Sequence, residues 1–178
     1  MIRLFAAIAV PGDVARALAP CMEGLPGVRW RPAETLHITL RFAGDTPEPE
    51  ADDLAAELSR VVGKPLNMRI AGVGTFGEGG DIDALWAGVD GGEPLAMLAR
   101  RCEAAARRAG LKPETRRWRP HVTLASVRRI EPQCIGAWIH AHSLLAVPPF
   151  AISQFGLYSS WRGGDGATYR LERSYALG

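Results

Sequence analysis

The chain carries two short segments that are almost identical: His-Ile-Thr-Leu at residues 37–40 and His-Val-Thr-Leu at residues 121–124. Both lie in apolar runs that are typical of β-strands. Successive side chains of a strand point to opposite faces, so residues two apart share a face. The pattern therefore predicts that His37 and Thr39 share one face, while the apolar residues next to them are buried on the other. The second segment repeats this arrangement.

The repetition favours a functional site over a pair of buried core histidines. The chain has only four histidines, and a single segment of this kind would more often be a core histidine beside a strand-forming threonine. Two copies make coincidence a poor explanation. Two such strands facing each other place two imidazoles and two hydroxyls around one space, which suits a phosphate between a general acid and a general base. The candidate catalytic residues are therefore His37, Thr39, His121 and Thr123.

The sequence around both segments resembles the 2H phosphoesterase superfamily, which is named for two His-x-Thr-x motifs. Trp-Arg-Pro at 30–32 and Leu-His-Ile-Thr-Leu-Arg-Phe-Ala-Gly-Asp at 36–45 resemble the first motif of the RNA 2′,3′-cyclic phosphodiesterases, once called 2′-5′ RNA ligases. Arg-Pro-His-Val-Thr-Leu-Ala at 119–125 resembles their second motif, and residues 3–8 resemble their first strand. The resemblance covers essentially the whole chain. It implies an α+β fold with two pseudo-symmetric lobes, formed by two antiparallel sheets flanked by helices around a central cleft.

The resemblance also implies a reaction, the metal-independent hydrolysis of RNA 2′,3′-cyclic phosphate ends to 2′-phosphate ends. In that reaction His37 is the proton donor to the ribose O3′ and His121 is the proton acceptor for water. The residue types alone do not decide which histidine has which role. Two threonine hydroxyls can donate hydrogen bonds to the phosphoryl oxygens. The alternatives are 2′-5′ RNA ligation or cleavage, hydrolysis of a small cyclic nucleotide, and a non-catalytic RNA-binding module, against which two intact histidine motifs argue.

Length and composition indicate one domain, residues 1–178, made of two intimate lobes, since 47% of the 178 residues are hydrophobic. No apolar run approaches a membrane-spanning length, and the first residues lack the layout of a signal peptide. The three cysteines are widely spaced and indicate neither a disulfide scaffold nor a zinc pattern. We expect a cytoplasmic monomer without cofactor, metal or membrane contact.

The net charge of +2 is unevenly distributed. Between residues 100 and 129, ten basic residues stand against only two acidic ones, Glu103 and Glu114. Such an excess suits a polyanionic substrate, although helix arginines are often merely solvated. Arg117 and Arg119 come just before the second motif and are the candidate substrate contacts.

Aromatic and histidine residues outside the motifs provide weaker candidates. Phe42 follows the first motif and is the preferred substrate-binding aromatic, while Phe5 and Trp118 are further candidates for stacking on a base. His140 and His142 lie in or after a helix and lack a threonine partner. Their spacing defines no metal site, so we expect them on the solvated surface.

Periodicity and turn residues predict the order of the secondary structure. The order of a motif strand, a helix and a pair of strands occurs twice. This repetition suggests two related lobes with the motifs meeting between them. The predicted strands are 2–10, 28–30, 36–42, 66–76, 84–89, 121–127, 150–161 and 167–175, with a loop at 44–49 and tight turns at 77–81 and 162–166. The predicted helices are 11–22, 47–62, 94–109 and 132–141.

Overall fold

The computed structural model describes residues 1–78, 81–128, 130–163 and 166–178. The turns predicted at 77–81 and 162–166 fall partly outside these ranges. The strands are β1 (Ile2–Ala9), β2 (Val28–Trp30), β3 (His37–Thr46), β4 (Leu66–Glu78), β5 (Asp81–Asp90), β6 (His121–Val127), β7 (Ala146–Ile152), β8 (Gln154–Gly163) and β9 (Gly166–Ala176). The α-helices are α1 (Gly12–Leu18), α2 (Glu48–Ser59), α3 (Gly92–Arg108) and α4 (Pro132–His142), with 3₁₀ turns at Ala19–Cys21 and Ala33–Thr35. Within these ranges no helix is long and apolar enough to span a membrane.

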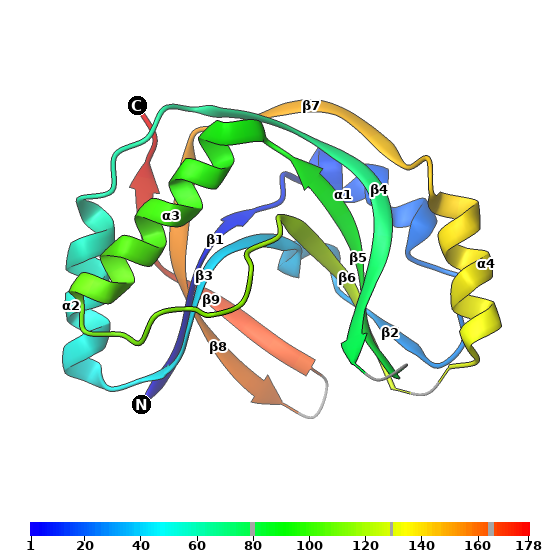
Figure 1. Cartoon of the computed structure of the whole chain (residues 1–178), viewed down its shortest axis with the longest axis horizontal. Coiled ribbons are helices and arrows are strands. Elements are labelled where there is room, and N and C mark those ends of the chain that lie inside the picture. The colour runs from blue at the N-terminus through cyan, green and yellow to red at the C-terminus, as the bar shows by residue number, and fades with distance from the viewer. Residues whose placement is uncertain (79–80, 129, 164–165) are drawn as a thin grey trace.

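The strands form one curled antiparallel sheet in the order β7-β4-β5-β6-β3-β1-β8-β9, and β2 pairs with β6 (Figure 1). The predicted α+β class is confirmed. The two predicted antiparallel sheets are the two halves of this sheet. They meet where the motif strands β3 and β6 lie side by side. Ile38 and Val122 are the one residue pair that joins these two strands. The junction of the two halves therefore lies within the two motifs.

The helices pack on different parts of the sheet, and α3 contacts strands of both halves, β3 and β4. Helices α2 and α3 pack on each other, α3 packs on β3, and α2 contacts β1 and β9 (Figure 1). Helix α1 contacts β7, and α4 contacts β4. Apolar side chains of the central strands fill the core, including Ile8, Ile38, Val122 and Leu124, each at most 1% exposed. This burial holds the backbones of both motif strands in place.

In each half of the sheet, the motif strand is accompanied by the strand pair that follows the other motif in sequence. The β4–β5 pair follows the first motif in sequence, but β5 pairs with β6 of the second motif. The β8–β9 pair follows the second motif, but β8 pairs with β1, which pairs with β3. The repeated order therefore does not describe two lobes consecutive in sequence, because strand pairing is a tertiary contact that chain order does not specify.

The prediction of a single strand over residues 150–161 is wrong. The structure has two strands there, β7 and β8, separated at Ser153. Strand β7 pairs with β4 at one end of the sheet, whereas β8 pairs with β1 and β9 in the other half. One straight strand cannot reach both places, so the chain turns at Ser153, whose carbonyl accepts a hydrogen bond from the Leu177 backbone at 2.7 Å.

Two predicted boundaries near the first motif also differ from the structure. Strand β3 continues to Thr46 through the segment predicted as a loop, because residues 44–46 pair with the start of β1. Helix α2 ends at Ser59 and not at Val62. The helices predicted at 94–109 and 132–141 and the strand at 121–127 agree with α3, α4 and β6 to within two residues.

Candidate active site

The structure places the four polar motif residues on one face of the central strand pair. Within β3 and β6, exposure alternates as the sequence predicts: His37, Thr39, His121 and Thr123 are half-buried, and the apolar residues between them are buried. The direct pairing of the two strands brings the motifs next to each other. The two histidines are close enough for the charge of His121 to disfavour protonation of His37. The geometry therefore assembles two imidazoles and two hydroxyls on one surface.

His37 is held by one hydrogen bond and two aromatic rings. Its Nδ1 lies 2.7 Å from the backbone carbonyl of Thr35. Since a carbonyl oxygen only accepts, Nδ1 carries the hydrogen and donates it, which leaves Nε2 free for proton transfer. The rings of Phe5 on β1 and Tyr169 on β9 have their centroids 4.8 and 5.0 Å from the imidazole. These contacts fix the orientation of the imidazole.

His121 has the same local arrangement on the other half of the sheet. Its Nδ1 donates to the backbone carbonyl of Arg119 at 2.7 Å, again two residues earlier in the chain. The Phe76 ring from β4 packs edge-on against the imidazole at 4.7 Å, and the Trp86 ring from β5 lies at 6.4 Å. Both histidines are therefore in the tautomer that leaves Nε2 without a hydrogen when neutral.

Burial lowers the pKa of both histidines. For His37, desolvation is the largest cause, the hydrogen bond to the Thr35 carbonyl acts against it, and the nearby charges of Arg31 and His121 lower the pKa further. For His121, desolvation is again largest, the bond to the Arg119 carbonyl opposes it, and the charge of Arg119 adds to the lowering. The free protein thus favours two neutral imidazoles near neutral pH.

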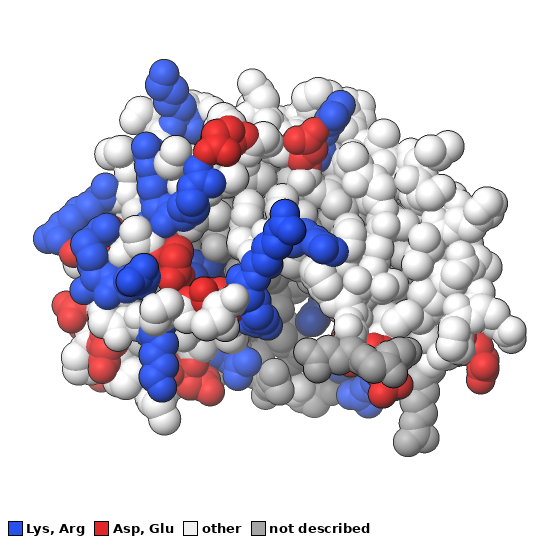
Figure 2. All heavy atoms as spheres, in the orientation of Figure 1, with Lys and Arg blue, Asp and Glu red and all other residues white. Residues whose placement is uncertain are grey.

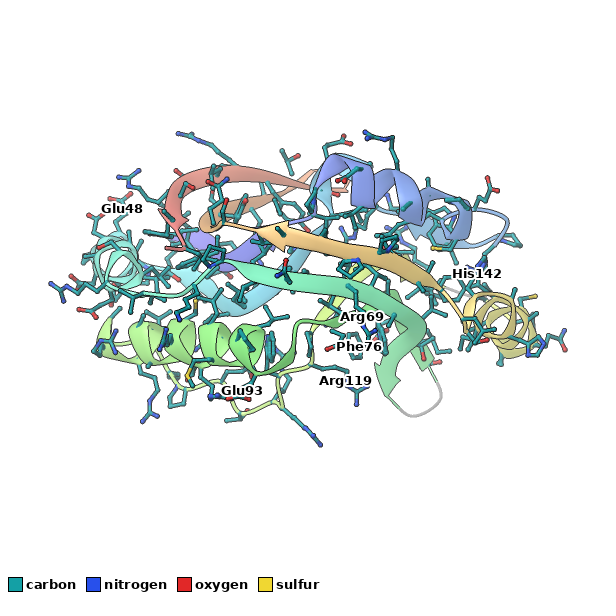
Figure 3. All side chains as sticks on the ribbon, turned by 90° about the horizontal axis from the view of Figure 1, so that it is seen from above. Glu48, Arg69, Phe76, Glu93, Arg119 and His142 are labelled. Atoms are coloured by element: carbon teal, nitrogen blue, oxygen red, sulfur yellow. The ribbon has the colours of Figure 1, made fainter. Side chains whose placement is uncertain are left out.

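The three arginines of the basic segment before β6 have different surroundings. The guanidinium of Arg119 lies 6.0 Å from the centroid of the Trp86 ring, beside His121, and Figure 3 labels it on the same side of the molecule as Phe76. Arg117 is exposed on the same segment. Arg116 is paired with Glu114 at 3.1 Å, and this contact lowers the pKa of Glu114 to about 2.

Other arginines of the basic window also have partners within the chain. On α3, Arg100 pairs with Glu93 and Arg108 pairs with Glu57 of α2. On the face seen in Figure 2, blue and red side chains are interspersed over this half of the molecule, whereas the other half of that face is mostly uncharged. Part of the local positive charge is therefore balanced. Arg119 differs in that its guanidinium lies over Trp86, one of the aromatic residues around His121.

The three aromatic candidates from the sequence have different environments. Phe5 is 3% exposed beneath His37, so it supports the imidazole and offers no open face to a base. Trp118 is half-buried and donates its indole N–H to the Thr39 carbonyl at 3.0 Å. Phe42 is half-buried, and the guanidinium of Arg3 covers its ring at 5.1 Å.

Several residues that surround the histidines lie outside both motifs. Tyr169, Phe76 and Trp86 come from β9, β4 and β5, far from either motif in sequence. Arg31 is the exception, because it belongs to the Trp-Arg-Pro sequence at residues 30–32, just before the first motif. An aromatic residue in an alternating strand is a weak signal by itself, because most such residues are core residues. Only the three-dimensional arrangement of the sheet identifies them as neighbours of His37 and His121.

His140 and His142 lie on α4. Figure 3 labels His142 beside this helix, apart from Phe76 and Arg119. His140 is exposed, and the His142 ring packs 5.4 Å from Trp138. In the described parts of the chain, no three histidine, cysteine, aspartate or glutamate side chains are grouped as a metal site would require.

Comparison with known proteins identifies the family. A family model described as the 2'-5' RNA ligase superfamily matches residues 11–163, and the chain belongs to this superfamily. A relative from Archaeoglobus fulgidus named RNA 2',3'-cyclic phosphodiesterase is 29% identical over 134 residues, which cover 74% of this chain and 76% of the relative. A relative of the same name from Geobacillus stearothermophilus is 28% identical over 145 residues, which cover 78% of this chain but only 46% of that longer protein.

The fold has close counterparts among solved structures. The crystal structure of TT0787 of Thermus thermophilus matches with a TM-score of 0.83 and 25% sequence identity, over 99% of this chain and 98% of that one. This agreement confirms the fold that the motif resemblance implied.

Proposed function

We propose that this protein hydrolyses RNA 2′,3′-cyclic phosphate ends to 2′-phosphate ends without a metal. The observation that carries the proposal is the matched environment of His37 and His121. Each donates Nδ1–H to a carbonyl two residues earlier, and each keeps Nε2 free on the same face of the sheet. Family membership and the names of the relatives support the choice of substrate.

In the proposed reaction the two histidines have opposite roles. Neutral His121 takes a proton at Nε2 from a water molecule, and the water oxygen forms a bond to phosphorus. The bond from phosphorus to O3′ breaks, and protonated His37 gives its Nε2 proton to the leaving O3′. The product has a 2′-phosphate and a 3′-hydroxyl. His121 then holds the extra proton and His37 lacks one, so exchange with solvent restores the starting state.

Thr39 and Thr123 supply the hydroxyl groups of the proposed site. Each is half-buried on the same face as its histidine. Their hydroxyls donate to the non-bridging phosphoryl oxygens, whose negative charge grows as water attacks. Arg119, beside His121, adds a positive charge for the same phosphate, and Arg117 and Phe42 are proposed to contact the rest of the substrate.

The low pKa of the two histidines fits this reaction once the substrate is bound. Burial and the charge of Arg31 disfavour protonated His37 in the free protein. An anionic phosphodiester beside the imidazole has the opposite effect and favours its protonated form. Substrate binding therefore helps to create the acid, while His121, the base, starts neutral.

The test is turnover of an RNA oligonucleotide with a 2′,3′-cyclic phosphate end by His37→Ala and His121→Ala, with the product phosphate position determined. Loss of an acid or base commonly costs about 10²–10⁴-fold. His142→Ala on α4 is the matched control and is expected to keep full activity. Near wild-type activity in a folded His37 or His121 variant would overturn the mechanism, and a 3′-phosphate product would overturn the assignment of the leaving oxygen.

Hydrolysis of a small cyclic nucleotide is the second candidate. It is favoured by the ion pairs of Arg100, Arg108 and Arg116, which offset part of the charge expected to attract RNA. Comparing kcat/KM for a nucleoside 2′,3′-cyclic monophosphate and for the oligonucleotide distinguishes the two. Ligation of 2′-5′ linkages would appear as joined products in the same assay.

A further inference from the structure

A buried arginine on the first motif strand contacts the segment that leads into the second motif. Arg41 is only 7% exposed, although it lies two residues after Thr39, where simple alternation would place it on the open face. The register between β1 and β3 shifts here: Ala7 pairs with Thr39, but Ala6 pairs with Arg41, so Leu40 is an extra residue. This β-bulge turns the Arg41 side chain to the opposite face, toward α3.

The guanidinium of Arg41 makes three different contacts there. It donates from Nε to the carboxylate of Glu103 on α3, and from one terminal nitrogen to the carbonyl of Phe42. The other terminal nitrogen donates to the carbonyl of Lys112 at 2.6 Å. The Glu103 carboxylate also accepts the backbone N–H of Glu114 at 3.2 Å. Arg41 and Glu103 together therefore hold the start of the segment that joins α3 to β6.

The end of the same segment is bound to β3 as well. The Trp118 indole N–H donates to the Thr39 carbonyl at 3.0 Å. The next residue is Arg119, whose carbonyl accepts the Nδ1–H of His121. The acceptor that orients the second histidine thus lies one residue from an anchor on the first motif strand. The two motif strands share only one residue pair directly, so these side-chain contacts add to the link between them.

We propose that Arg41 and Trp118 are positioning residues, which use the first motif strand to hold the Arg119 carbonyl in place and thereby set the tautomer and orientation of His121. Neither residue has a role in the proton transfers. The effect on turnover rests on the proposed function, because it requires His121 to be the base. The effect on the imidazole of His121 does not.

A buried charge is a costly way to secure a segment if stability is the only gain. Removing one partner of a buried ion pair is strongly destabilising, whereas apolar residues of similar size often replace the whole pair without loss. Arg41 is useful here because one planar guanidinium can bind a carboxylate and two carbonyls at fixed angles. Lysine keeps the charge but has no such rigid fork. Arg41→Lys therefore tests the geometry separately from the charge.

The experiment uses Arg41→Lys and Trp118→Phe. Trp161→Phe on the exposed part of β8 is the matched tryptophan control, and Arg69→Lys is the arginine control, since its pair with Asp90 is solvent-exposed. Imidazole ¹H–¹⁵N NMR of the free protein reports the tautomer and titration of each histidine. Turnover of a nucleoside 2′,3′-cyclic monophosphate, normalised to folded protein, reports kcat and KM.

In both test variants we expect His121 to become a mixture of tautomers and to titrate at lower pH, because the carbonyl bond that supports its protonated form is weakened. The resonances of His37 should keep their wild-type tautomer. We expect kcat to fall about 10–100-fold with KM nearly unchanged, as for other misplaced catalytic groups. Both control variants should behave as wild type.

A purely structural role would lower the melting temperature while leaving the His121 tautomer and the kcat of folded protein unchanged, and that result would overturn the proposal. If the NMR spectrum of His121 changes but His121→Ala is itself fully active, the positioning is supported and the proposed function fails. The two ideas are therefore tested separately.

Discussion

Replacing Gly74 with alanine should disturb the aromatic support of His121. Gly74 on β4 pairs with Trp86 on β5, and the indole lies over the glycine. A Cβ at position 74 would lie 2.3, 2.5 and 2.8 Å from three ring atoms of Trp86. Carbon atoms normally stay about 3.5–4.0 Å apart, so the indole must move by about 1 Å. The buried indole N–H of Trp86 has no hydrogen-bond partner in the described residues, so no hydrogen bond holds the ring against this displacement.

The size of the effect follows from this overlap. An extra carbon in a well-packed site typically costs about 1–3 kcal/mol. For a domain of this length, each kcal/mol lowers the melting temperature by about 2–4 °C, so we expect a loss of roughly 2–12 °C. Trp86 also lies beside both His121 and the guanidinium of Arg119. Since a shift of about 1 Å near reacting groups can cost up to 100-fold, we expect kcat/KM to fall about ten-fold or more.

The assay combines thermal unfolding with turnover of a nucleoside 2′,3′-cyclic monophosphate. Gly136→Ala is the control, because Gly136 lies within α4 and a Cβ there meets no atom within 4 Å. Replacing a helix-interior glycine with alanine should stabilise the protein by about 0.5–1 kcal/mol and leave turnover unchanged. If Gly74→Ala is as stable and as active as wild type, the inference that Trp86 supports His121 through Gly74 is wrong.

Four further outcomes are expected from the same site. Thr39→Val and Thr123→Val should each slow turnover by about 1–4 kcal/mol in activation free energy, measured by single-turnover kinetics; unchanged rates would exclude the hydroxyls as donors. The pH profile of kcat/KM should be bell-shaped. It should be centred below the ordinary histidine pKa of about 6.5, because burial lowers the pKa of both His37 and His121. The profile of kcat should lie at higher pH, because bound phosphate raises the pKa of the acid. Activity should survive EDTA, because the segments 37–40 and 121–124 contain no carboxylate to hold a divalent ion. Rescue by added metal after such treatment would contradict the proposal. Arg117→Glu should weaken RNA oligonucleotide binding in a salt-dependent way while sparing cyclic mononucleotide turnover, whereas equal effects on both substrates would argue against an RNA contact there.

The pKa lowering also predicts how stability depends on pH. A histidine whose pKa is lower in the folded state binds fewer protons there than in the unfolded chain. Stability therefore rises with pH through the interval between the two values, and it is lost as pH falls below about 6.5. His37→Ala should reduce this loss in thermal unfolding measured between pH 5 and pH 7. An unchanged pH dependence would mean that His37 is as easily protonated in the folded protein as in the unfolded chain.

The faces of the motif strands could be predicted from the sequence, because alternation along a strand is a local property of the backbone. The apolar residues between His37 and Thr39, and between His121 and Thr123, must be buried if these segments are strands, so the polar residues share the other face. The extent of β6 could be predicted for the same reason, and those of α3 and α4 from helical periodicity and helix-terminal residues, which are also local.

The partners of those residues depend on the tertiary structure. Tyr169, Phe76 and Trp86 reach the histidines only because β9, β4 and β5 belong to the same curled sheet as the motif strands, with β5 directly beside β6. Strand pairing joins segments without regard to their distance in sequence. The break at Ser153 arises because β7 and β8 pair in opposite halves of the sheet. The burial of Arg41 arises from one extra residue in the register of β1 and β3, since a one-residue shift moves a side chain to the other face. Alternation along the chain can therefore identify which side chains of a strand share a face. Only the packing of strands and helices decides which residues each of those side chains contacts.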